Sequence, residues 1–166
     1  GIRLNARVAA LEGGDTVRLE DSERLQARHV VLATDAPTTF RLLGRECPLA
    51  FGATTALYFK AAVPPRRGPY LYLNGDGQGL INHVCFPSEV SPGYAPPGQT
   101  LVSVSVVGAP DMPADQLENA VYDELIAWFG NAVRGWRPLR HYRVPYALPA
   151  ATALYGHAGA ALAQTL

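Results

Sequence analysis

The sequence has few cysteines, no excess of either charge and no long hydrophobic run. Its two cysteines, Cys47 and Cys85, are too few for a disulfide framework, which favours a reducing cytoplasm as the location. The 14 basic and 14 acidic residues balance, and no basic run exceeds a pair such as Arg66-Arg67, which argues against nucleic acid or an anionic membrane as a partner. No apolar stretch approaches the length of a transmembrane span, and the first residues lack the pattern of a secretory signal. We therefore expect a cytoplasmic protein.

The length is that of one ordinary domain. A chain of 166 residues buries roughly 70% of the surface that its unfolded form exposes, so a core is expected. The chain starts at Gly1 inside a strand-like pattern, and its only methionine is Met112. We therefore expect it to be a part of something longer, either an excised or natural fragment or the remnant of a gene.

A nearly uninterrupted apolar run at residues 29–33 is the centre of the N-terminal part. Its β-branched residues predict a strand that is covered on both faces. Asp35 then suits an N-cap and Pro37 a first helical turn, and a short helix at residues 38–43 is predicted to end at Gly44. A strand that leads directly into a helix N-terminus favours an anion such as phosphate. From this stretch alone, a strand–turn–helix without a ligand is the preferred interpretation.

Before this run, the sequence predicts two strands, each followed by a turn, and a third strand that leads into the run. Residues 2–10 alternate between apolar and polar, residues 13–15 form a turn, residues 16–20 form a second strand, residues 21–23 turn again, and residue 24 begins the return. The pattern predicts a small antiparallel meander that leads into the buried strand.

The rest of the chain is predicted to consist mostly of strands. They are expected at residues 53–63, 70–73, 80–86, 100–108 and 140–144, with a hairpin-type turn at 74–77 and a loop at 87–98. Tyr58 and Lys60 share one face of the first of these strands. Helical spacing of Leu117, Val121 and Leu125 predicts one long helix at residues 113–129, capped by Asp111 and ended by Gly130. The predicted fold class is α+β, with a mostly antiparallel (mixed) β-sheet and one long packed helix.

Several motifs of other chemistries are absent or weak. Gly75, Gly77 and Gly79 are interpreted as turn glycines, because a strand rather than a helix follows them. His83 and Cys85 share a strand face, but two ligands do not make a zinc site, so no metal is predicted. No G-x-S-x-G elbow is present. No catalytic residue is assigned.

Two segments resemble known flavoenzymes. The first consists of residues 4–8 and 21–37, and the second of residues 123–130, followed by Trp136 and residues 144–149. Both resemble FAD-dependent amine oxidases and, more closely, their phytoene-desaturase and protoporphyrinogen-oxidase-like relatives. The two segments occur in the right order and, with the strands between them, cover nearly the whole chain up to Pro149.

The resemblance implies three parts and a set of cofactor contacts. Residues 1–44 would be the β-meander and strand–turn–helix of an incomplete FAD-binding domain, residues 45–145 a substrate-binding domain, and residues 146–166 the return towards the FAD domain. It implies that the backbone of Val8 meets the adenine end of FAD and that Ala33 and Thr34 lie where a strand closes over the dinucleotide. Trp136 and Tyr146 are expected next to the flavin, because they immediately precede the return.

The sequence also departs from the family. It contains no G-x-G-x-x-G to hold the FAD pyrophosphate and no matching acidic residue for the ribose, and residues 150–166 lack the Gly-Asp pair with which the family continues. We therefore expect weak or no FAD binding and no catalysis by this chain alone, with the missing FAD-binding segment of the same protein as its partner.

The expected function is the substrate-binding portion of an FAD-dependent oxidoreductase that oxidises an apolar or amine substrate by hydride transfer to flavin. Candidate substrate-lining residues are tyrosines that periodicity does not assign to the core, namely Tyr58, Tyr70, Tyr72, Tyr94 and Tyr142. The alternative is a stand-alone module that binds a small ligand or a partner without redox chemistry. An amine, a polyene and a porphyrinogen all remain open as substrates.

Overall fold

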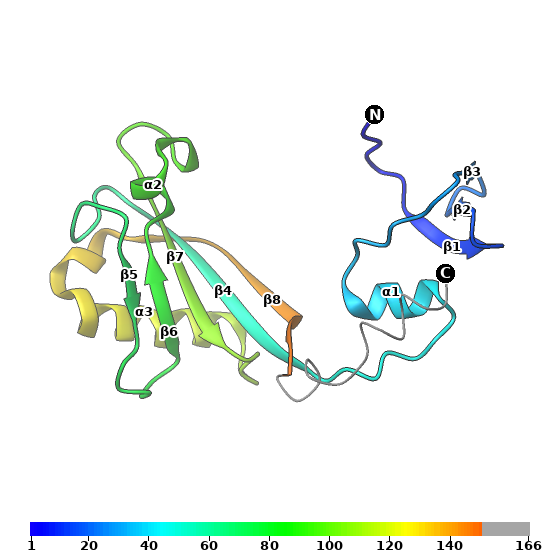
Figure 1. The fold of residues 1–166 in the computed structure, drawn as a ribbon. Helices are drawn as coiled ribbons and strands as arrows, with labels where there is room; N and C mark the ends of the chain where they lie inside the picture. The colour runs from blue at the N-terminus through cyan, green and yellow to red at the C-terminus, as the bar shows by residue number, and fades with distance from the viewer. Residues whose placement is uncertain (151–166) are drawn as a thin grey trace. The chain divides into compact units, whose positions relative to one another are not determined.

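A computed structural model describes residues 1–150 of the chain. Its contacts divide it into two units, Gly1–Ala50 and Phe51–Leu148, with Pro149 belonging to the first. Each unit has a β-sheet of its own, of three strands in the first and five in the second (Figure 1). The mixed α+β class with antiparallel pairing, predicted from the sequence, is confirmed.

The first unit consists of a meander and a short helix. Strands β1 (Val8–Glu12), β2 (Thr16–Leu19) and β3 (Arg24–Gln26) pair antiparallel in that order. Helix α1 spans Ala36–Leu42, and the Asp35 carboxylate caps it by accepting a hydrogen bond of 2.8 Å from the backbone N–H of Thr38. Arg41 of α1 donates to the carbonyl of Ala9 in β1 over 3.3 Å, which ties the helix to the meander. The predicted meander and the predicted cap are therefore confirmed.

The apolar run at residues 29–33 is not a strand in the described structure. The sheet of the first unit ends at β3, so no strand among residues 1–150 pairs with the run, and Val31 is 87% exposed. A strand covered on both faces needs hydrogen-bonded neighbours, and none is supplied here. The prediction of a buried strand was therefore wrong for this chain taken by itself. The first strand is also shorter than predicted, since residues 1–7 lie outside it.

The second unit is a five-stranded sheet with one long helix. Its strands are β4 (Phe51–Ala61), β5 (Leu71–Leu73), β6 (Ile81–Cys85), β7 (Thr100–Val107) and β8 (Arg137–Pro149), in the spatial order β5-β6-β7-β4-β8. Helix α3 spans Ala114–Phe129 and runs across one face of this sheet (Figure 1). Short helices α2 (Pro87–Val90), η1 (Pro92–Tyr94) and η2 (Gly130–Gly135) lie in the connections.

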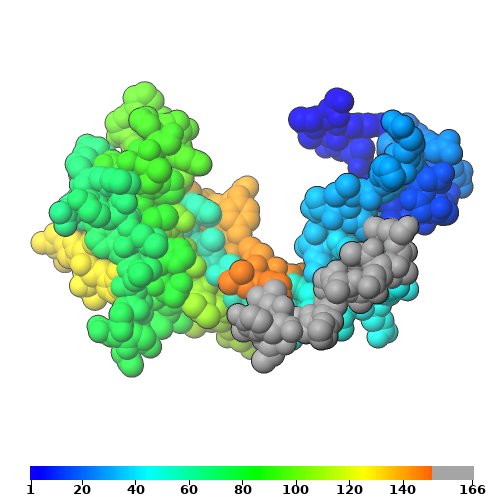
Figure 2. Space-filling view, in the orientation of Figure 1, coloured from blue at the N-terminus to red at the C-terminus, as the bar shows by residue number. Residues whose placement is uncertain are grey.

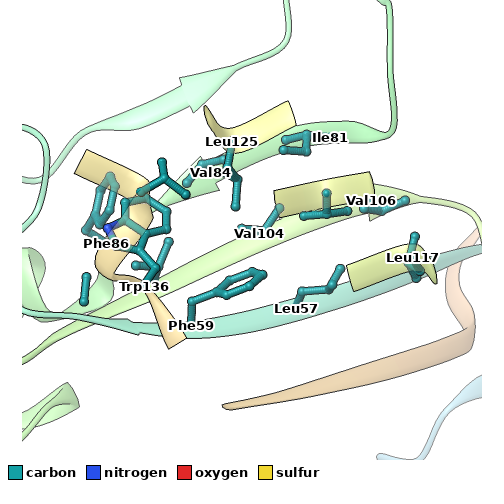
Figure 3. Close-up of a cluster of buried hydrophobic side chains, with 14 residues drawn as sticks. Leu57, Phe59, Ile81, Val84, Phe86, Val104, Val106, Leu117, Leu125 and Trp136 are labelled. Carbon is teal, nitrogen blue, oxygen red and sulfur yellow. The ribbon is translucent and has the colours of Figure 1, made fainter. Parts of the chain in front are cut away.

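The core lies between α3 and the sheet. Leu117, Val121 and Leu125 recur at helical spacing and are at most 1% exposed. They point into the same cluster as Leu57 of β4 and Val104 of β7 (Figure 3). Alternation along each strand therefore assigns one face of the sheet to the core and leaves the other for other contacts.

Two boundaries differ from the sequence prediction. Helix α3 has Pro113 at its N-cap with no side-chain hydrogen bond, so the prediction that Asp111 caps it was wrong. The fixed φ of a proline suits the start of a helix, and it places the cap position two residues after Asp111. Strand β8 is longer than the predicted 140–144 and lies at the edge of the sheet, on the surface of its unit (orange in Figure 2). Gly130 ends α3 with φ +62°, as predicted.

Candidate functional site

The face of the second sheet opposite α3 carries polar and aromatic side chains. We call it the open face. The central residues of this face are all at least partly exposed. They are Thr54, Ala56, Tyr58 and Lys60 of β4, His83 and Cys85 of β6, and Ser103 and Ser105 of β7. Register arranges them in rows, because Tyr58 pairs with Ser103, which pairs with Cys85, and Ala56 pairs with Ser105, which pairs with His83. On the open face, small polar groups thus lie beside one tyrosine ring, and the exposed side chains of Leu71 and Leu73, which pair with Cys85 and His83, border them.

Two of the predicted substrate tyrosines meet on this face. The rings of Tyr58 and Tyr142 of β8 lie 6.0 Å apart, edge to face, at an interplanar angle of 81°. The Arg140 guanidinium lies 5.8 Å above the Tyr142 ring and donates to its hydroxyl over 3.4 Å. This hydrogen bond raises the pKa of Arg140 above its ordinary value, so Arg140 stays charged. Because the two rings are nearly perpendicular, the pair forms an aromatic corner with a cation at its side.

The polar groups of the open face are suited to holding a ligand rather than to nucleophilic attack. Burial raises the pKa of the Cys85 thiol, and a hydrogen bond with Ser103 only partly offsets this, so the thiol stays protonated at neutral pH. The Thr54 hydroxyl donates to the Val106 carbonyl over 3.0 Å. Within residues 1–150, no group of three side chains could hold a metal ion.

A separate hollow of about 470 Å³ lies in the first unit. It brings together the three residues predicted at the dinucleotide: Val8 of β1, and Ala33 and Thr34 before α1. Apart from Arg7 and Arg41, the residues that line the hollow are uncharged. The lining residues are Ala6, Arg7, Val8, Leu11, Val17, Val30, Val31, Leu32, Ala33, Thr34, Thr38, Arg41 and Leu42. Pockets with largely apolar walls are typical binding places for small ligands.

The helix N-terminus beside this hollow does not offer the anion site that the sequence pattern suggested. The Asp35 carboxylate occupies the position of an anion, and the hydrogen bond from the Thr38 N–H lowers the pKa of Asp35. The lining of the hollow contains two arginines and otherwise uncharged residues, and no glycine is among them.

The remaining predicted site residues lie elsewhere in the second unit. Trp136 is 2% exposed, in the core beside Phe86, and Tyr72 packs edge to face on Phe129 with ring centres 5.0 Å apart. Tyr94 in η1 is 63% exposed, and Tyr146 is 58% exposed with its ring against that of Phe51. Tyr70 lies beneath the Arg66 guanidinium at 4.4 Å. The structure does not bring these residues together with the Tyr58–Tyr142 pair.

Two charged residues of the open face were given no role at the sequence level. Lys60 and Arg140 each stand two residues from one of the paired tyrosines, so β-strand alternation puts each cation on the same face as its tyrosine. That spacing is the signal that could have identified them, once the pairing of β4 with β8 was known.

Comparisons with known proteins identify a family and a fold. The model of a family described as flavin containing amine oxidoreductase matches residues 1–163. No curated protein matches the chain. Similar solved structures include the PF1083 protein of Pyrococcus furiosus, with 16% identity over 87% of this chain and 38% of that chain and a TM-score of 0.62. An oxidoreductase of Methanosarcina mazei has 19% identity over 83% and 36%, with a TM-score of 0.56.

Reduced UDP-galactopyranose mutase has 11% identity over 87% of this chain and 34% of that chain, with a TM-score of 0.62. The chain thus spans 34% to 38% of the length of these three structures. At such identities the likeness shows the fold alone. Among the described residues, no helix is long and apolar enough to cross a membrane.

Proposed function

The chain belongs to the flavin-containing amine oxidoreductases, and from this membership we propose that it forms the substrate-binding part of an FAD-dependent oxidoreductase. The observation that carries the proposal is the asymmetry of the second sheet. One face is filled by α3, whereas the open face presents the Tyr58–Tyr142 pair and a row of hydroxyl groups. In this proposal the open face contributes a wall of the substrate site.

The chain's own residues would bind and orient rather than react. The face of one tyrosine ring and the edge of the other would contact the apolar part of a substrate, and the hydroxyl groups of Ser103 and Ser105 would accept hydrogen bonds from its polar end or donate them to it. A bound FAD would supply the hydride acceptor. The hollow at Val8, Ala33 and Thr34 would hold the adenine end of that cofactor.

The experiment uses the protein produced from the gene's whole open reading frame. It is mixed anaerobically with a panel of apolar and amine compounds, benzylamine among them, while the visible absorption of oxidised flavin is followed. We expect at least one compound to bleach this absorption. Replacing Tyr58 by alanine should raise the concentration of the compound that gives half-maximal bleaching, because the contact of the substrate with the Tyr58 ring is lost.

Val90→Ala is the control, since Val90 is an exposed apolar residue of α2 that has no predicted role in the site. Equal effects of the two substitutions would argue against the open face as the substrate wall. Absence of any flavin from the whole protein would refute the oxidoreductase proposal and leave the binding module without redox chemistry.

A further inference from the structure

The open face carries positive charge only. Lys60 and Arg140 are its two full cations, and no Asp or Glu stands among the residues that strand register and ring contacts place there, within the part of the chain described. The balanced charge of the whole sequence therefore hides a local asymmetry.

Each tyrosine of the aromatic pair has a cation two residues away in its own strand. Lys60 follows Tyr58 by two residues in β4 and is exposed, and Arg140 lies over the Tyr142 ring. Neither cation is in an ion pair with a carboxylate of residues 1–150, whereas Arg3, Arg18 and Arg24 elsewhere in this region are. A guanidinium without a carboxylate partner keeps its planar fork available for one, and the ring beneath it holds it in place.

We infer that the substrate bound at this face carries a carboxylate attached to a flat apolar body. The inference rests on the proposed function and names its substrate class. The carboxylate would contact Arg140 and Lys60, and the apolar body would lie against the rings of Tyr58 and Tyr142. A substrate whose only charge is an alkylammonium would meet two like charges and no counter-ion.

The test compares 3-phenylpropionate with 3-phenylpropylamine, which have the same ring and chain length and opposite charges. Their dissociation constants for the protein from the whole reading frame are measured by ligand-observed NMR at low and at high salt. We expect the carboxylate to bind about tenfold more tightly at low salt, the combined effect of two solvent-exposed ion pairs. The preference should shrink at high salt, because both cations are exposed.

The variant Lys60→Gln/Arg140→Gln should lose the preference for the carboxylate. Arg134→Gln, which removes an exposed cation of η2 away from the open face, should keep it. Tighter binding of the amine, binding of neither compound, or equal loss in the control variant would each overturn the inference. Since the flavin absorption is recorded on the same samples, a protein that holds flavin but prefers the amine refutes the substrate class alone. A protein that holds no flavin refutes the proposed function.

Discussion

Replacing Gly79 by alanine should destabilise the second unit far more than the same change at Gly77, two residues earlier in the same turn. Both glycines have positive φ, of +79° and +64°, so each substitution forces an alanine into the left-handed region at about 1 kcal/mol. At Gly79 a Cβ would also stand 2.6 Å from the Cδ and Oε1 atoms of Glu124, whereas nothing lies within 4 Å at Gly77.

The Glu124 carboxylate joins α3 to the start of β6. It accepts hydrogen bonds from the backbone N–H groups of Leu80 at 2.8 Å and Ile81 at 3.2 Å. A Cβ at Gly79 displaces this carboxylate, and losing hydrogen bonds to a charged acceptor costs about 1.5–3 kcal/mol. Gly79→Ala should therefore lower the free energy of unfolding by about 2.5–4 kcal/mol and Gly77→Ala by about 1 kcal/mol.

Urea unfolding followed by tryptophan fluorescence measures both values. In the Glu124→Ala background the contact is already gone, so the additional effect of Gly79→Ala should fall to the backbone cost of about 1 kcal/mol. Equal losses for Gly77→Ala and Gly79→Ala, or full additivity in the double variant, would refute the role assigned to Glu124.

Two further predictions concern residues that the sequence singled out. Because the Thr38 N–H lowers the pKa of Asp35, the cap should stabilise α1 fully above the ordinary pKa of an aspartate, and this should be lost as the pH falls through the lowered pKa. NMR of the Thr38 amide should show this transition in the native protein and not in Asp35→Asn. For Trp136→Phe, loss of ring volume is offset by removal of the indole N–H, which has no hydrogen-bond partner within residues 1–150, so the free energy of unfolding should change by less than about 1.5 kcal/mol. A loss above about 3 kcal/mol in urea unfolding would contradict this account of Trp136.

Local patterns predicted most of the second unit. Alternation placed Tyr58 on the face opposite Leu57 and Phe59, and helical spacing identified the three core residues of α3. These predictions succeed because the burial of a strand or helix face repeats with the period of the element itself.

What the local patterns leave open depends on partners distant in the sequence. The sheet face on which Tyr72 lies depends on its pairing with Val84 of β6. Strand β5 has three residues, which are too few for an alternating pattern to predict that face. The run at residues 29–33 has the composition of a buried strand, but composition does not supply the neighbours that would pair with it. No role was predicted for Lys60 and Arg140, because the pairing of β4 with β8 joins segments that are far apart in the sequence.

The most direct test of the account is the amount of flavin that survives gel filtration, measured from visible absorption in two samples. One is the 166-residue chain, and the other is the protein from the whole reading frame. In the proposed function the hollow at Val8, Ala33 and Thr34 holds only the adenine end of FAD, and the sequence contains no glycine-rich motif for the pyrophosphate. We therefore predict no retained flavin for the chain alone and one flavin per molecule for the whole protein. Flavin retained in full by the chain alone, or none retained by the whole protein, would contradict the claim that this chain is the substrate-binding part of a flavin-dependent oxidoreductase.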